Sequence, residues 1–105
     1  MEKIAFIPVI PIGELPEGTV RRCVIKEQAV ALYNVNGQIY ATDDNCTHGL
    51  ASLADGYLEG DEIECPLHQG AFNVRTGEAV GRPCTVALKT YPVEIEDGLI
   101  QVNVD

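Results

Sequence analysis

Apolar and polar residues alternate with period two toward the C-terminus. Val93 and Ile95 alternate with glutamates, and alternation resumes over residues 100–105 after an Asp97-Gly98 turn. Period two with one apolar face is typical of an antiparallel sheet that exposes its other face to water. No segment sustains a helical period, so the sequence predicts an all-β protein.

Residues 1–42 carry strand signals of the same kind. We expect strands over residues 3–9, 19–26, 28–35 and 39–42, with a turn over residues 12–18. Asn36-Gly37 lies between two of these apolar runs. Asn-Gly is a strong hairpin signal because both residues tolerate positive φ.

Residues 43–83 differ in character, since they hold six of the ten glycines and no long periodic run. Short strands are expected over residues 62–65 and 71–74, with a turn over residues 75–78. The sequence therefore predicts a single domain over residues 1–105, an antiparallel β-sandwich or open barrel. Its basal β part would be residues 1–42 and 84–105, with an inserted, loop-rich lobe over residues 43–83.

The candidate chemistry lies in this lobe. Both histidines of the chain and two of its four cysteines form the pattern Cys46-x-His48, then sixteen residues, then Cys65-x2-His68. Residues this scarce rarely pair twice by chance. Two thiolates and two imidazoles predict a metal centre, and both zinc and iron–sulfur sites use these donors.

The pattern resembles the Rieske family. The resemblance extends to Gly49 and Pro66 and to three further stretches, Asp55–Gly60, Glu64–Gly70 and Thr76-Gly77. It implies one [2Fe-2S] cluster that serves as both cofactor and metal site. Cys46 and Cys65 would hold the inner iron, and His48 and His68 the outer iron near the surface.

These stretches are similar to the Rieske-type ferredoxins of bacterial aromatic-ring-hydroxylating dioxygenase systems, such as those for naphthalene and biphenyl. The resemblance implies a one-electron carrier rather than an enzyme. It would take electrons from an NAD(P)H-dependent flavoprotein reductase and pass them to a terminal oxygenase. The chain also has no histidine left for a 2-His-1-carboxylate iron site and no glycine-rich nucleotide motif.

Two other interpretations stay open on sequence alone. One is a structural Cys2His2 zinc domain, although common zinc fingers pair cysteine with cysteine first. The other is a small Rieske-fold subunit of a larger reductase. A red-brown colour of the purified protein, or gel filtration of the native complex, would separate these interpretations from the leading one.

The formal net charge of −9 disfavours nucleic acid and anionic membranes as partners and favours a basic protein surface. No signal peptide and no apolar run of about 18 residues is evident. We therefore expect a cytoplasmic protein, monomeric when free. A docking rim of acidic residues around the lobe is predicted at Asp43, Asp44, Asp55, Glu59, Asp61, Glu62 and Glu64.

Several other residues receive narrower expectations. Gly49 and Gly70 either direct backbone amides to the sulfides or are plain turn glycines, and Pro66 either stiffens the second loop or is an ordinary turn proline. Leu50 and Leu67 are expected to pack near the site, and Cys23 and Cys84 to be buried thiols. By resemblance a cover is expected at Gly81-Arg82-Pro83, whereas Tyr40, Tyr57 and Tyr91 are expected to be packing residues.

The potential is expected to be low. High-potential Rieske proteins carry a serine and a tyrosine two and four positions after the second histidine, where this chain has Gly70 and Phe72. They also carry a disulfide at the positions of Ala51 and Leu67. Without these hydroxyl donors and this brace, we expect roughly −150 mV, the low end of the Rieske range.

Overall fold

A computed structural model describes residues 6–47, 51–66, 70–81 and 86–104. These residues form eleven strands and two 3₁₀ turns. The elements are β1 Ile7–Pro11, η1 Ile12–Glu14, β2 Val20–Ile25, β3 Gln28–Val35, β4 Gln38–Asp43, η2 Leu53–Asp55, β5 Tyr57–Glu59, β6 Glu62–Glu64, β7 Ala71–Asn73, β8 Ala79–Gly81, β9 Thr90–Tyr91, β10 Val93–Glu96 and β11 Leu99–Val102.

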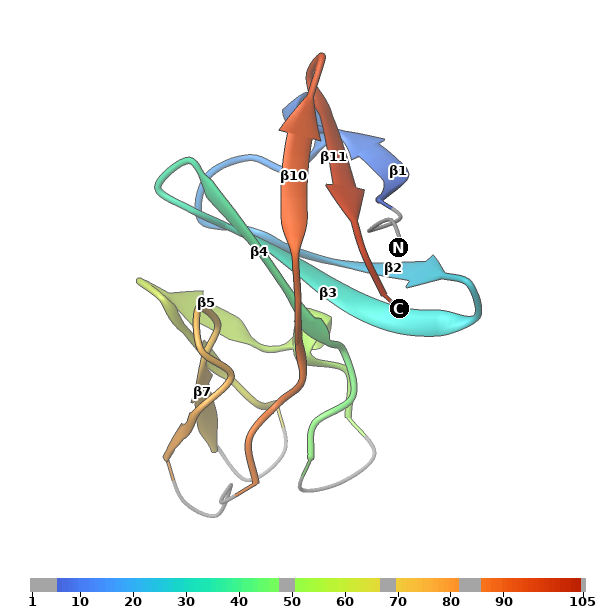
Figure 1. Cartoon of the computed structure of the whole chain (residues 1–105). Coiled ribbons are helices and arrows are strands. Elements are labelled where there is room, and N and C mark those ends of the chain that lie inside the picture. Colours follow the sequence, from blue (N-terminus) through green and yellow to red (C-terminus); the bar gives the residue numbers. More distant parts are fainter. Residues whose placement is uncertain (1–5, 48–50, 67–69, 82–85, 105) are drawn as a thin grey trace.

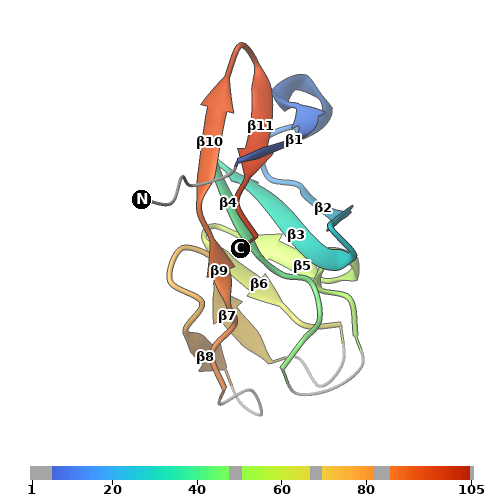
Figure 2. The same ribbon diagram turned by 45° about the vertical axis from the view of Figure 1, so that its right-hand side comes forward.

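The strands form three antiparallel sheets, in the orders β1-β11-β10, β2-β3-β4-β9 and β5-β6-β7-β8. Figures 1 and 2 show the sheet of β2, β3, β4 and β9 between the other two. The sheet of β5–β8 lies at one end of the molecule, and the β10–β11 hairpin projects at the other. The prediction of an all-β, antiparallel sandwich or barrel is confirmed.

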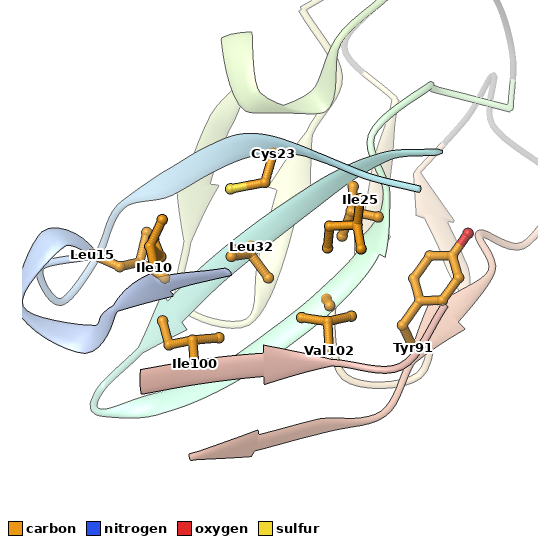
Figure 3. Close-up of a cluster of buried hydrophobic side chains, with 10 residues drawn as sticks. Ile10, Leu15, Cys23, Ile25, Leu32, Tyr91, Ile100 and Val102 are labelled. Atoms are coloured by element: carbon orange, nitrogen blue, oxygen red, sulfur yellow. The ribbon is translucent and has the colours of Figure 1, made fainter. Parts of the chain in front are cut away.

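Strand β3 is buried on both faces because it is in the middle layer. Val30 and Leu32 face a core shared with β1, β2 and β11, which we call the basal core (Figure 3). Ala31 and Tyr33 face a second core, shared with the lobe sheet, which we call the lobe core. Alternate residues of one strand therefore fasten the two ends of the molecule together.

Four two-residue turns join neighbouring antiparallel strands in the described part of the chain, and three of them have positive φ at both positions. Asn36-Gly37 and Asp97-Gly98 have positive φ at both positions, as a type I′ hairpin requires, so both turn predictions are confirmed. Lys26-Glu27 also has positive φ at both positions, although neither residue is a usual turn former. The tight register of β2 with β3 imposes this turn, which composition alone did not indicate.

Two expectations about the basal strands were only partly right. Residues 3–5 of the first expected strand lie outside the described residues, and the strand that is described runs over Ile7–Pro11. On the expected apolar face of β10, Val93 is half-buried and 43% of Ile95 is exposed. Strand β10 is the edge strand of its sheet, which leaves one of its sides without a neighbouring strand.

Candidate metal centre

Each of the two candidate cysteines begins a loop that is closed in the same way. The backbone N–H of Cys46 donates to the carbonyl of Ala51 at 3.0 Å, and that of Cys65 donates to the carbonyl of Gly70 at 2.6 Å. Both bonds join residues five positions apart. We call residues 46–51 the first cysteine loop and residues 65–70 the second.

The structure brings the two cysteines into one environment. Cys46 is 1% exposed and Cys65 is 2% exposed, and both belong to the lobe core. Their neighbours in that core include Tyr33, Phe72 and Leu88. Two buried sulfurs at the start of two equivalent loops fit the thiolate half of an iron–sulfur or zinc site. The predicted ligands His48 and His68 lie outside the described residues.

The bases of the two loops are built differently. The second cysteine loop joins β6 to β7, whose register pairs Glu64 with Ala71 directly beside the loop. The first cysteine loop lies beyond the end of β4 and has one isolated bridge, between Asn45 and Ser52. Strand pairing therefore supports the second loop more fully than the first.

Asp44 supplies the missing support, and its assignment to an exposed docking rim was wrong. The residue is 2% exposed. Its carboxylate accepts hydrogen bonds from the Ser52 hydroxyl and the Ala54 N–H, and pairs with Arg22 of β2. Its backbone carbonyl accepts the N–H of Leu53 at 2.7 Å. A buried carboxylate is stable only with such partners, which the sequence around it did not reveal.

Gly56 brings the end of the first loop region against the start of the second. It follows η2, and a Cβ at this position would lie 2.0 Å from the carbonyl oxygen of Glu64 and 3.2 Å from that of Leu53. Glu64 directly precedes Cys65. Only a residue without a side chain permits this approach, so Gly56 sets the spacing of the two loops.

A segment that is distant in sequence also contacts the first cysteine loop. The Thr47 hydroxyl donates to the carbonyl of Val86 at 2.8 Å. Val86 is 62% exposed and follows a stretch that contains most of the predicted cover, Gly81-Arg82-Pro83. Arg82, Pro83 and Cys84 lie outside the described residues, as do Gly49, Leu50 and Leu67.

Tyr33 is a core residue that sequence reasoning missed. Its ring is fully buried in the lobe core, which also contains the two cysteines, and its hydroxyl forms a hydrogen bond with the Thr42 hydroxyl at 2.8 Å. Burial raises the pKa of this phenol, so it stays protonated and neutral at physiological pH. Its place on a strand buried on both faces was not evident from sequence alternation.

The other three tyrosines differ in their burial. Tyr91 is buried, and its hydroxyl donates to the half-buried Asp43. Tyr40 packs against the lobe core, so both are confirmed as packing residues. Tyr57 is 71% exposed, so the same expectation for it was wrong. In the register of β5 with β6, Leu58 faces the core and Tyr57 therefore points outward.

Three glutamates gather around Tyr57. A hollow of about 380 Å³ on the lobe sheet is lined by Tyr57, Leu58, Glu59, Glu62, Glu64 and Ala71, and we call it the acidic hollow. Glu59 and Glu62 are directly opposite each other on β5 and β6. Like charges in that position disfavour the folded state, and no lysine or arginine among the described residues lines the hollow.

Cys23 has no place in the candidate centre. It is buried in the basal core, on the other side of the middle sheet, and burial raises the pKa of its thiol (Figure 3). The prediction of a buried thiol is confirmed for Cys23.

Within the described ranges, no helix is long and apolar enough to cross a membrane.

Comparisons with known proteins agree with this site. Residues 5–92 match the family model of the Rieske [2Fe-2S] domain. The chain is 50% identical over 98 residues to the ferredoxin component of the naphthalene 1,2-dioxygenase system of Pseudomonas aeruginosa, covering 93% of this chain and 94% of the relative.

Solved structures give the same result. The ferredoxin of Sphingomonas yanoikuyae B1 matches with a TM-score of 0.92 and 39% identity, over 96% of this chain and 100% of that chain. A chain of the complex of reduced oxygenase and oxidised ferredoxin in carbazole 1,9a-dioxygenase matches with a TM-score of 0.89 and 45% identity, over 96% of this chain and 94% of that chain. The zinc interpretation finds no support. The chain belongs to the Rieske [2Fe-2S] domain family, and its cofactor is one [2Fe-2S] cluster.

Proposed function

We propose that this protein is the ferredoxin of an aromatic-ring-hydroxylating dioxygenase system. It carries one electron at a time and is not itself an enzyme. The observation that carries the proposal is the match at 50% identity, over more than nine-tenths of both chains, to a ferredoxin component of a naphthalene dioxygenase system. The cluster would supply the one-electron chemistry, and the chain's own residues would hold it.

The ligand set we propose is Cys46, Cys65, His48 and His68. The two cysteines would hold the inner iron, and the two histidines the outer iron. Support comes from the burial of both sulfurs and from the matching hydrogen bonds that close both loops. Neutral imidazoles in place of two thiolates raise the cluster's potential above that of an all-cysteine ferredoxin.

The donor would be an NAD(P)H-dependent flavoprotein reductase and the acceptor a terminal oxygenase. A related ferredoxin is known in complex with the oxygenase of carbazole 1,9a-dioxygenase, which supports the second partner. The net charge of −9 favours basic docking surfaces on both. Neither nucleic acid nor membrane is proposed as a partner. The setting would be the cytoplasm, with the ferredoxin monomeric between encounters.

We also propose that the chain divides, by role, into a cluster-binding lobe over residues 43–83 and a basal part over residues 1–42 and 84–105. The whole sheet of β5–β8 lies within the lobe range, and the whole sheet of β1, β10 and β11 lies outside it. The lobe would carry the electron-transfer chemistry, while the basal part would supply a stable base.

Reconstitution tests the function. The holoprotein is mixed with a flavoprotein ferredoxin reductase, a terminal naphthalene dioxygenase, NAD(P)H and naphthalene. Product should form only when the holoprotein is added, and each molecule of holoprotein should support the formation of many molecules of product. If the reductase does not reduce the cluster, as followed by its visible spectrum, or if reduced protein does not support turnover, the proposed role is wrong.

Ligand variants test the site separately. Cys46→Ser, Cys65→Ser, His48→Ala and His68→Ala should each fail to assemble the normal cluster. Full iron and sulfide content with an unchanged EPR spectrum in any one variant would remove that residue from the ligand set.

A further inference from the structure

The buried carboxylate of Asp44 lies two residues before Cys46, and its side chain is 4% exposed. Both of its oxygens are used. Oδ1 accepts the N–H of Ala54 at 3.0 Å, and Oδ2 accepts the Ser52 hydroxyl at 2.6 Å and lies 3.3 Å from Nε of Arg22. The simplest interpretation of these contacts, a generic core ion pair, does not explain why they converge on this loop.

The contacts connect the two sides of the first cysteine loop. Asp44 lies on the incoming side, whereas Ser52 and Ala54 lie on the outgoing side, just after the residue that accepts the hydrogen bond from Cys46. In the second cysteine loop the paired strands β6 and β7 hold the corresponding sides together. The carboxylate therefore does for the first loop what a strand ladder does for the second.

We propose that Asp44 is the positioning residue of the first cysteine loop. It acts through the Ser52 hydroxyl and the Ala54 backbone to fix the direction in which the loop presents Cys46, while Arg22 balances its charge. This inference rests on the proposed function, because it takes Cys46 as a ligand of the cluster. Without the carboxylate, only backbone hydrogen bonds join the two sides among the described residues, and Cys46 is held less rigidly in its orientation toward the iron.

Asp44→Asn tests the proposal, with Glu64→Gln as the matched control. Both changes remove one negative charge within two residues of a cysteine ligand and preserve side-chain size. Glu64 is half-buried, and its side chain makes no hydrogen bond or ion pair to any residue that the structure describes. Two readouts are compared in the holoproteins: the rate of cluster loss to an iron chelator, and the g-values of the reduced protein by EPR.

Replacing a residue that orients a metal ligand typically weakens metal binding about 10–100-fold. Asp44→Asn should therefore lose its cluster about 10–100-fold faster than wild type, and its reduced form should show shifted g-values. Glu64→Gln should remain within about twofold of wild type with unchanged g-values, because strand pairing holds its loop. Wild-type behaviour of Asp44→Asn would overturn the proposal. So would equal effects in the two variants, since charge alone would then account for them.

Ser52→Ala keeps the proposal testable if Asp44→Asn yields no holoprotein. It removes one contact and leaves the charge in place, so it should shift both readouts in the same direction by a smaller amount. Wild-type rate and g-values in Ser52→Ala would then overturn the proposal. Neither readout requires turnover with the reductase or the oxygenase. The reconstitution assay and the ligand variants test the proposed function separately.

Discussion

Replacing Gly56 by alanine should disturb the site without changing a single polar group. Gly56 lies where the first loop region ends, against the backbone just before Cys65. Its φ of −89° and ψ of −161° are extended, so alanine can adopt this backbone conformation without strain. The cost is therefore purely steric.

The structure gives the size of the clash. The new Cβ would lie 2.0 Å from the carbonyl oxygen of Glu64, and ordinary contact begins at 3.4 Å, so the two must separate by about 1.4 Å. Both are held by backbone, and no side-chain rotation can relieve them. Forced expansion of a packed site costs about 1–3 kcal/mol, and the rigidity here favours the upper end.

The measurements are the thermal midpoint of the holoprotein, compared at one scan rate, and its iron content. A loss of about 1–3 kcal/mol lowers the midpoint of a domain this size by roughly 5–20 °C. Iron content should also fall, because the same displacement moves the two cysteine loops apart.

Gly13→Ala is the control. Gly13 is in the exposed turn η1 with nothing within 4 Å of its Cβ position, so this variant should keep the wild-type midpoint within about 2 °C. If Gly56→Ala matches Gly13→Ala in both midpoint and iron content, close packing at Gly56 does not set the spacing of the loops.

Three further predictions concern separate parts of the molecule. Cys23→Ala should retain full iron content and an unchanged EPR spectrum. In the wild-type protein, the Cys23 thiol should be alkylated slowly, and the rate should increase only as the pH rises toward its raised pKa. Rapid alkylation at neutral pH would contradict its burial. Electron transfer to the oxygenase should slow as ionic strength rises, and changing the three glutamates of the acidic hollow to glutamine should flatten that dependence; stopped-flow rates that ignore salt would argue against charge-guided docking. Gly70→Ser with Phe72→Tyr should raise the midpoint potential by adding hydroxyl donors near the sulfurs, and an unchanged potential in a fully loaded variant would reject that explanation.

Sequence reasoning predicted the β-class and the turns because both depend on local chemistry. Period-two alternation fixes which side of a strand is apolar, and Asn36-Gly37 and Asp97-Gly98 tolerate positive φ where a hairpin needs it. Alternation could also have placed Tyr57 with Glu59 on the outer face of β5, since Leu58 between them is the core residue. The ligand candidates followed from the scarcity of histidine.

The supports of the site were not predictable in the same way. Asp44 sits in an acidic stretch that is typical of an exposed surface, and its burial depends on Arg22, which comes from a different strand. Gly56 has the appearance of a turn glycine, and its role depends on the backbone of Glu64 across the lobe. Such features come from tertiary contacts, which composition and periodicity along one segment do not contain.

The central claim, a low-potential Rieske carrier between a flavoprotein and an oxygenase, is tested most directly by redox titration of the purified holoprotein followed by EPR. Gly70 lacks a side chain and the fully buried Phe72 lacks a hydroxyl, so neither can donate a side-chain hydrogen bond to the cluster. The account predicts a midpoint of roughly −150 mV. A midpoint well above zero would contradict it.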